Sequence, residues 1–122
     1  MKLSRYVFAR LCGVLMLSLL WGCSRHGATV LGQPPEGTVV DLATARLASG
    51  GASVIVRGKM IEKCPEAGCW FVLQDGSGKA RVDTKTAGFV VVEVPLNRML
   101  TVSGTWVTNG AEVLLAATGI RY

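Results

Sequence analysis

This 122-residue sequence contains a single histidine, lacks paired carboxylates and has no strong excess of one charge. Its single histidine, His26, lies in a segment rich in Gly and Pro, so a Ser or Cys nucleophile elsewhere in the chain has no imidazole base at hand. Asp83 and Glu93 are isolated carboxylates in strand-like segments, which does not suit acid/base catalysis. No phosphate-cradling glycine pattern opens a helix. We therefore expect a protein without catalytic residues, which is not an enzyme.

The net charge of +5 overstates how basic the working part of the chain is. Of the 13 Lys and Arg residues, three (Lys2, Arg5 and Arg10) lie in the N-terminal segment, which leaves ten against eight Asp and Glu. The remainder contains no run of basic residues that would follow a phosphate backbone. The charge pattern therefore excludes nucleic acid from the expected partners.

The first 22 residues have the form of a secretory signal peptide that ends before a lipid-attachment cysteine. A positive start precedes the apolar residues 11–21, and the box Leu20-Trp21-Gly22-Cys23 follows. A membrane span would need about 20 apolar residues, and Arg10 cuts this run short. The box resembles that of bacterial lipoproteins, although Trp21 is bulkier than usual. We predict that Cys23 carries the lipid and, because Ser24 follows it, that the protein is held at the outer membrane facing the periplasm.

The rest of the chain divides into a tether and one domain. Residues 23–38 are rich in Gly, Pro and small polar side chains and predict a flexible tether. Residues 39–122 are enough for one small domain. In that domain, Asp41 is a candidate N-cap for a short helix of two to three turns that ends before Gly50-Gly51 and carries Leu42, Ala45 and residues 47–48 on one face.

After Gly51 the sequence has the character of an all-β domain. Its strongest hairpin signals are Asp75-Gly76 and Asn109-Gly110. Two candidate strands carry a central glycine, Gly58 and Gly104, which permits the sharp coiling of a strand at a barrel corner. These features predict a small OB-fold-like barrel of five to six strands after one short helix. The expected strands are short runs rich in Val, Ile, Thr and aromatic residues, at 52–63, 69–75, 79–85, 88–94, 99–107 and 112–120.

Residues 38–122 also resemble a known group of proteins. A Val-x-Gly strand is followed by Cys64, a short turn into Gly68-Cys69-Trp70, and Leu73-x-Asp75-Gly76. This arrangement resembles small exported bacterial OB-fold lipoproteins of largely unassigned function. The resemblance implies the fold and the compartment, and it carries no catalytic residue over.

Cys64 and Cys69 are the residues with the most chemical potential, and three interpretations compete. In an oxidising compartment two cysteines at the ends of paired strands favour a structural disulfide, which would stabilise by only about 2 kcal/mol because the loop is short. Alternatively, reduced thiolates would bind Cu(I), with Met60 as a third sulfur ligand, making this an envelope copper-handling protein. A redox-active pair is the third interpretation, although a thioredoxin-type site has two intervening residues and a helix N-terminus, whereas here there are four residues between strands. We expect the disulfide, with no metal or cofactor.

Two tryptophans are candidates for a ligand surface. Trp70 and Trp106 lie in strands and would, if partly exposed, form an aromatic platform for a sugar, a peptide or a partner protein. The alternative is that Trp106 fills the barrel and Trp70 covers the cysteines. The sequence thus predicts a lipid-anchored binding or accessory module whose partner is an unidentified envelope protein, peptide or sugar.

Overall fold

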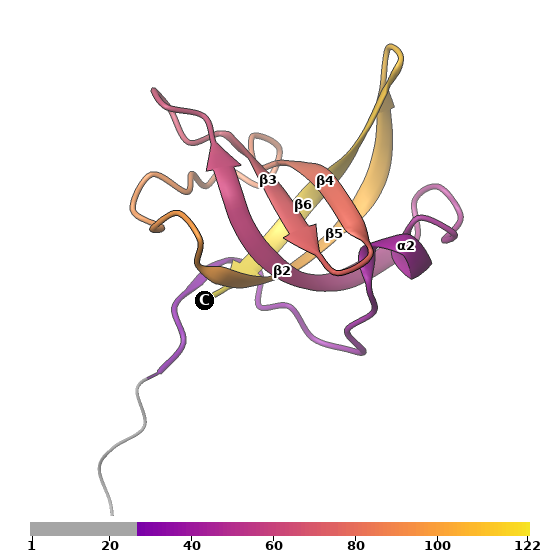
Figure 1. Cartoon of the computed structure of the whole chain (residues 1–122), viewed down its shortest axis with the longest axis horizontal. Coiled ribbons are helices and arrows are strands. Elements are labelled where there is room, and N and C mark those ends of the chain that lie inside the picture. The colour runs from indigo at the N-terminus through magenta and orange to yellow at the C-terminus, as the bar shows by residue number, and fades with distance from the viewer. Residues whose placement is uncertain (1–26) are drawn as a thin grey trace, which may run out of the picture.

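Six strands and one short helix make up residues 27–122, the part of the chain that the computed structural model describes (Figure 1). The predicted signal peptide, Cys23 and the first residues of the predicted tether lie outside it. No helix among the described residues has the length and apolar character to cross a membrane. The elements are β1 (Val30–Gly32), α2 (Leu42–Ala45), β2 (Ser53–Lys63), β3 (Trp70–Asp75), β4 (Gly78–Asp83), β5 (Met99–Asn109) and β6 (Glu112–Arg121).

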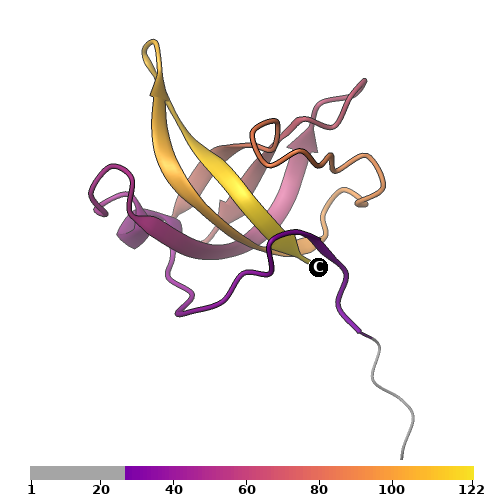
Figure 2. The same ribbon diagram turned by 180° about the vertical axis from the view of Figure 1, so that it is seen from behind.

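Strands β2 to β6 close into a barrel, as the sequence predicts. The long strand β2 pairs with β5 over Ser53–Lys59 and then with β3 from Lys59 onward, so it belongs to both sides of the barrel. A short parallel pairing of β4 with β6 closes the ring, and β1 adds to the outer edge of β6. Figure 2 shows the β5–β6 hairpin from behind, projecting well beyond the barrel wall. The all-β, OB-fold-like class is thereby confirmed.

The two strand glycines lie where neighbouring backbones approach most closely. A Cβ added to Gly58 would stand 2.5 Å from the carbonyl oxygen of Gln74, and one added to Gly104 would stand 2.4 Å from that of Ala116. Gly58 immediately precedes the residue at which β2 changes partner, and Gly104 follows a bulge in the β5–β6 ladder. Both glycines therefore allow the coiling that closes the barrel.

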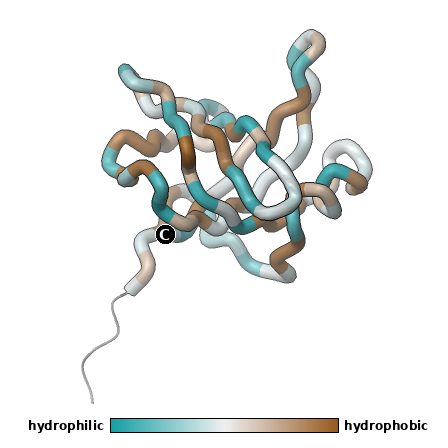
Figure 3. The backbone as a smooth tube through the Cα atoms, viewed as in Figure 1, coloured by the Kyte–Doolittle hydropathy of each residue, from teal (hydrophilic) through white to brown (hydrophobic). Residues whose placement is uncertain are grey.

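The core lies inside the barrel and continues beneath α2. Hydrophobic stretches on the strands alternate with polar ones in Figure 3, as expected for strands with one buried face. The largest fully buried side chains come from β2 to β6, from α2 and from the loop between β4 and β5: Phe71, Leu42, Met60, Leu73, Leu100, Leu115, Ile120, Val56, Val82, Val91, Val94 and Val102.

The expected strand at 88–94 does not form. The chain there runs as a loop of turns in which Val91 and Val94 are buried while Val90 and Val92 are half exposed. The buried valines are three residues apart, which is not the two-residue period of a strand. The end of β4 that leads into this segment, Val82 and Asp83, is already paired on both sides, with β3 and with β6. With no free edge beside it, the segment packs over one end of the barrel without joining the sheet.

The N-terminal segment also differs from expectation in two places. Residues 30–32, within the predicted tether, form β1 against Gly119–Arg121. The predicted helix of two to three turns is the four-residue α2, capped as expected by Asp41, whose carboxylate accepts from the Thr44 N–H at 2.7 Å. The chain leaves the helix after Ala45, so Leu47 is not on its buried face.

Candidate functional site

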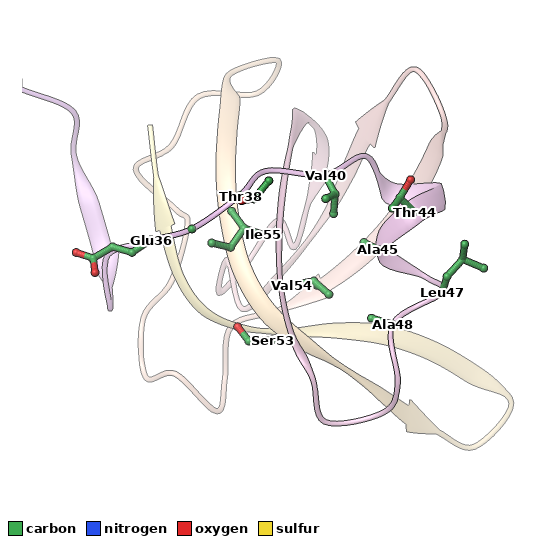
Figure 4. Close-up of a pocket in the computed structure, with 11 residues that line it drawn as sticks. Glu36, Thr38, Val40, Thr44, Ala45, Leu47, Ala48, Ser53, Val54 and Ile55 are labelled. Carbon is green, nitrogen blue, oxygen red and sulfur yellow. The ribbon is translucent and has the colours of Figure 1, made fainter.

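A groove lies between the N-terminal segment and the start of β2 (Figure 4). Its volume is about 630 Å³, within the range of known ligand sites. Apolar side chains from α2, the following turn and β2 line most of it, and Glu36, Thr38, Thr44 and Ser53 supply polar groups. Leu47 stands at its margin with 85% of its surface exposed, the most exposed large apolar side chain of the described chain. The lining includes no aromatic ring.

Asp75 holds the helical wall of the groove against the barrel. From the β3–β4 turn, its Oδ2 accepts from the Leu42 N–H at 2.8 Å, while Oδ1 accepts from the Ser77 N–H at 2.7 Å, the Ser77 hydroxyl at 2.6 Å and the Gly78 N–H at 3.1 Å. Burial alone would raise the pKa of Asp75, but the hydrogen bonds from Ser77, Leu42 and Gly78 outweigh it and lower the pKa. The Ser77 hydroxyl also accepts from the Ala43 N–H at 3.0 Å. The hairpin turn thus supplements the Asp41 cap by accepting from the Leu42 and Ala43 N–H groups at the start of α2.

The far end of α2 is held by Trp106. The indole Nε1–H of Trp106 donates to the Ala45 carbonyl at 2.8 Å, and the Arg46 guanidinium stacks over the indole ring at 5.2 Å. Arg46 also donates to the Lys79 carbonyl. With both ends of the short helix fixed, the groove is built on a rigid wall.

The other wall offers backbone hydrogen-bonding groups. The Val40 N–H donates to the Ile55 carbonyl at 2.9 Å, which shows that the N–H and C=O of Ile55 face away from β5. Since orientation repeats every second residue in a strand, those of Ser53 face the same way. Among the described residues, the Val40 bond is the backbone bond that joins this stretch of β2 to the N-terminal segment. The Ser53 end of the β2 edge therefore remains open beside the apolar lining.

The loop from Cys64 to Cys69 lies at the opposite end of β2. Both cysteines are half-buried free thiols. Hydrogen bonds from the backbone N–H groups of Ala67 and Glu66 lower the pKa of Cys64 to about 7; desolvation opposes the effect, and the Cys69 thiol and the Gly68 N–H add to it. The structure thus brings the two cysteines together, and their pairing as a disulfide stays a prediction.

Hydrogen bonds anchor this loop independently of the cysteine side chains. The Cys64 N–H donates to the Trp70 carbonyl at 3.0 Å, and the Cys69 carbonyl accepts from both the N–H and the hydroxyl of buried Thr84, each at 3.0 Å. The Val91 N–H donates to the Gly68 carbonyl at 2.9 Å. Both flanks of the loop are therefore fixed to the barrel.

The third donor proposed for copper is not at this loop. Met60 is fully buried in the core, and it precedes Cys64 by four residues of extended strand, roughly 13 Å. Within residues 27–122, no group of three His, Cys, Asp or Glu side chains is placed to hold a metal ion. The copper alternative is thereby reduced to two thiols.

The two tryptophans do not share a surface. Residues that pair directly across neighbouring strands lie on the same face of the sheet. Trp106 pairs with Leu115, Leu115 pairs with Val82, and Val82 pairs with the buried Phe71. Trp106 therefore lies on the inner face, at the barrel end. Trp70 is the neighbour of Phe71 in β3 and points to the outer face, where the Arg81 guanidinium stacks on it at 4.5 Å. The two rings therefore do not form the candidate platform, and Trp106 packs against the core as in the alternative interpretation.

Sequence reasoning missed the groove because it placed Leu47 on the buried face of a longer helix. The helical spacing of Leu42, Ala45 and Ala48 at intervals of three leaves Leu47 out of phase, and this was the available signal. The open edge of β2 had no such signal, because it depends on which strands pair.

Comparison with known proteins supports the fold and little else. No protein-family model matches the chain, and no curated protein does. Among solved structures, it is similar to the hypothetical protein ygiW from E. coli, with 21% sequence identity and a TM-score of 0.55. The match covers 71% of this chain and 91% of that one. At this identity the similarity shows a shared small β-barrel fold.

Proposed function

We propose that this protein is a lipid-anchored module of the bacterial cell envelope that binds an extended, apolar peptide segment of another envelope protein, without catalysing a reaction. The observation that carries the proposal is the groove beside the open edge of β2, where apolar lining and unpaired backbone groups occur together. The lipid at Cys23 and the envelope location are supported by the sequence pattern of residues 1–24.

A peptide suits this groove better than a sugar does. An added strand would bond through its backbone to the Ser53 end of the β2 edge and would place alternate side chains among Val40, Ala48 and Val54. The exposed Leu47 would be covered by the same peptide. Sugar sites commonly stack the sugar on an aromatic ring, and the groove lining includes none.

The full chain is exported and purified in detergent, and peptides that bind it are selected from a displayed library. The test measures the affinity of these peptides for the protein and its variants. Leu47→Ser should weaken binding about tenfold or more, because the side chain would lose most of a buried contact worth about 1.5–3 kcal/mol. The matched control is Val113→Ser, since Val113 on β6 is also an exposed apolar side chain but does not line the groove. Peptides N-methylated at the residues facing β2 should lose binding, whereas methylation of the alternate residues should be tolerated. Binding that ignores both changes would contradict the proposal.

A further inference from the structure

The loop from Cys64 to Cys69 combines three features that a merely structural disulfide does not need. First, both cysteines are only partly buried at the surface of the barrel end, so the loop is accessible without unfolding the barrel. Second, the N–H groups of Ala67 and Glu66 in the turn lower the pKa of the Cys64 thiol. Third, the flanks are already fixed through Thr84 and Val91, so a covalent link is not required to close the loop.

From this arrangement we propose that Cys64 and Cys69 form a thiol–disulfide exchange site, in which Cys64 is the attacking sulfur and Cys69 the resolving one. The substrate class is an accessible disulfide, of a protein or of a small thiol, in the same compartment. The site lies at the far end of β2 from the groove and is independent of the proposed peptide binding.

The exchange reaction needs no reactant besides the two cysteines, the substrate disulfide and water. The Cys64 thiolate attacks one sulfur of the substrate disulfide; a mixed disulfide forms, and the other substrate sulfur leaves as a thiolate that takes a proton from water. Cys69 then gives its proton to solvent and attacks the Cys64 sulfur, which releases the second substrate thiolate. The substrate disulfide is reduced by two electrons, and the cysteine pair is oxidised to a disulfide. The reverse sequence oxidises a dithiol.

The turn supplies what a helix N-terminus supplies in other reactive thiols. Pro65 follows Cys64, and the N–H groups of Glu66, Ala67 and Gly68 stabilise a negative sulfur at the start of the turn. Gly68 allows this turn with φ of +58°, and a Cβ there would meet the Val92 backbone N at 2.7 Å. The stabilisation of the Cys64 thiolate comes from backbone donors and the Cys69 thiol rather than from nearby charges. The charged residues on and around the loop are Lys63, Glu66, Asp83, Lys85 and Glu93.

Lys63 keeps the surrounding loop in place. Its Nζ donates to the Val92 carbonyl at 2.9 Å and to the Val94 carbonyl at 2.7 Å, which ties the loop between β4 and β5 to the end of β2. Val90 and Val92 of that loop are half exposed. A protein substrate would therefore meet an apolar surface beside the two thiols.

The test uses the full exported chain, reduced and then treated with glutathione disulfide at pH 7, with products followed by intact mass. In Cys69→Ser, the remaining thiol should react up to about sixfold faster in the folded protein than in urea. Thiolate content rises about fiftyfold when the pKa falls from 9.0 to about 7, and lower intrinsic nucleophilicity offsets most of that. Sixfold is the upper value because the variant lacks the Cys69 thiol, one of the smaller contributions to the lowered pKa. The matched variant Cys64→Ser should show no such acceleration on folding. The wild type should pass through the mixed disulfide to an internal disulfide, which dithiothreitol should reduce without unfolding.

Four results would overturn the proposal. These are equal acceleration of the two thiols on folding, a wild type that stops at the mixed disulfide, a native disulfide that resists reduction until the barrel unfolds, and tight Cu(I) retention without exchange. If a variant does not fold, peptide mapping of partly alkylated wild type answers the same question, because Cys64 should be labelled before Cys69. These thiol measurements do not depend on peptide binding to the groove, so the two proposals can fail separately.

Discussion

Replacing Asp75 with Asn tests whether the β3–β4 turn supports α2 and with it the groove. The Asp75 carboxylate accepts four hydrogen bonds, one at Oδ2 from Leu42 and three at Oδ1. The asparagine side chain has one acceptor oxygen and one NH2 group. If its oxygen accepts the three hydrogen bonds from the turn, its NH2 group faces the Leu42 N–H, and two donors then stand opposite each other. One charge-assisted hydrogen bond is then lost, at a cost of about 2 kcal/mol. For a domain of this size the melting temperature should fall by about 8–16 °C.

The pH dependence identifies the charge as the cause. The pKa of Asp75 is lower in the folded protein, so its contribution to stability is fully present above the unfolded pKa of about 3.9 and is lost as the pH falls through the lowered folded value. The difference between wild type and Asp75→Asn should be full at pH 7 and should shrink toward zero well below pH 4. The assay is thermal unfolding followed by circular dichroism at both pH values.

Asp83→Asn is the matched control for this measurement. Asp83 lies on the same hairpin, and its carboxylate accepts from the Lys85 N–H at 2.8 Å, one contact where Asp75 has four. Its substitution should change the melting temperature by a few degrees at most. Equal melting temperatures for wild type and Asp75→Asn at neutral pH, or a difference that persists unchanged in acid, would refute the role assigned to the carboxylate.

Three further predictions concern the barrel, the helix and the thiol. Gly104→Ala should cost on the order of 1–3 kcal/mol in unfolding free energy, because its Cβ would stand 2.4 Å from a carbonyl oxygen of β6, whereas Gly76→Ala enters open space and should be neutral; equal chemical denaturation midpoints would contradict this. Trp106→Phe keeps a ring but leaves the helix carbonyl without its donor, so stability should fall by about 1–2 kcal/mol and peptide affinity with it; unchanged unfolding would argue against this tie. Alkylation of Cys64 in the wild type, followed against pH by peptide mapping, should have its midpoint near the pKa of about 7, and a midpoint near 9.0 would show that the turn does not stabilise the thiolate.

Local chemistry in the sequence was enough to predict the barrel. The hairpins at Asp75-Gly76 and Asn109-Gly110 form as expected because their turn requirements lie within a few residues. The strand glycines Gly58 and Gly104 also lie at the close backbone approaches that the sequence predicts, since a glycine weakens a long strand of β-branched residues and marks a bend or a close contact there. These features depend on neighbours along the chain.

The departures depend on partners that are distant in sequence. The valine-rich segment 88–94 has the composition of a strand and forms none, because the end of β4 that leads into it is already paired on both sides. The short helix has its own N-cap in Asp41, but further contacts at its two ends come from the β3–β4 turn and from Trp106, which are distant in sequence. The lowered pKa of Cys64 could not be predicted, because a spacing of four residues does not reveal where turn N–H groups point.

The measurement that tests peptide binding most directly is a map of backbone amide chemical shifts in the full exported chain, titrated with a peptide selected on it. The largest changes should lie along the groove, at Val40, Leu47, Ser53 and Ile55, and in Leu47→Ser they should require about tenfold more peptide or more. Changes confined to the barrel end formed by residues 64–69 and 84–98, or no saturable change at all, would contradict the account.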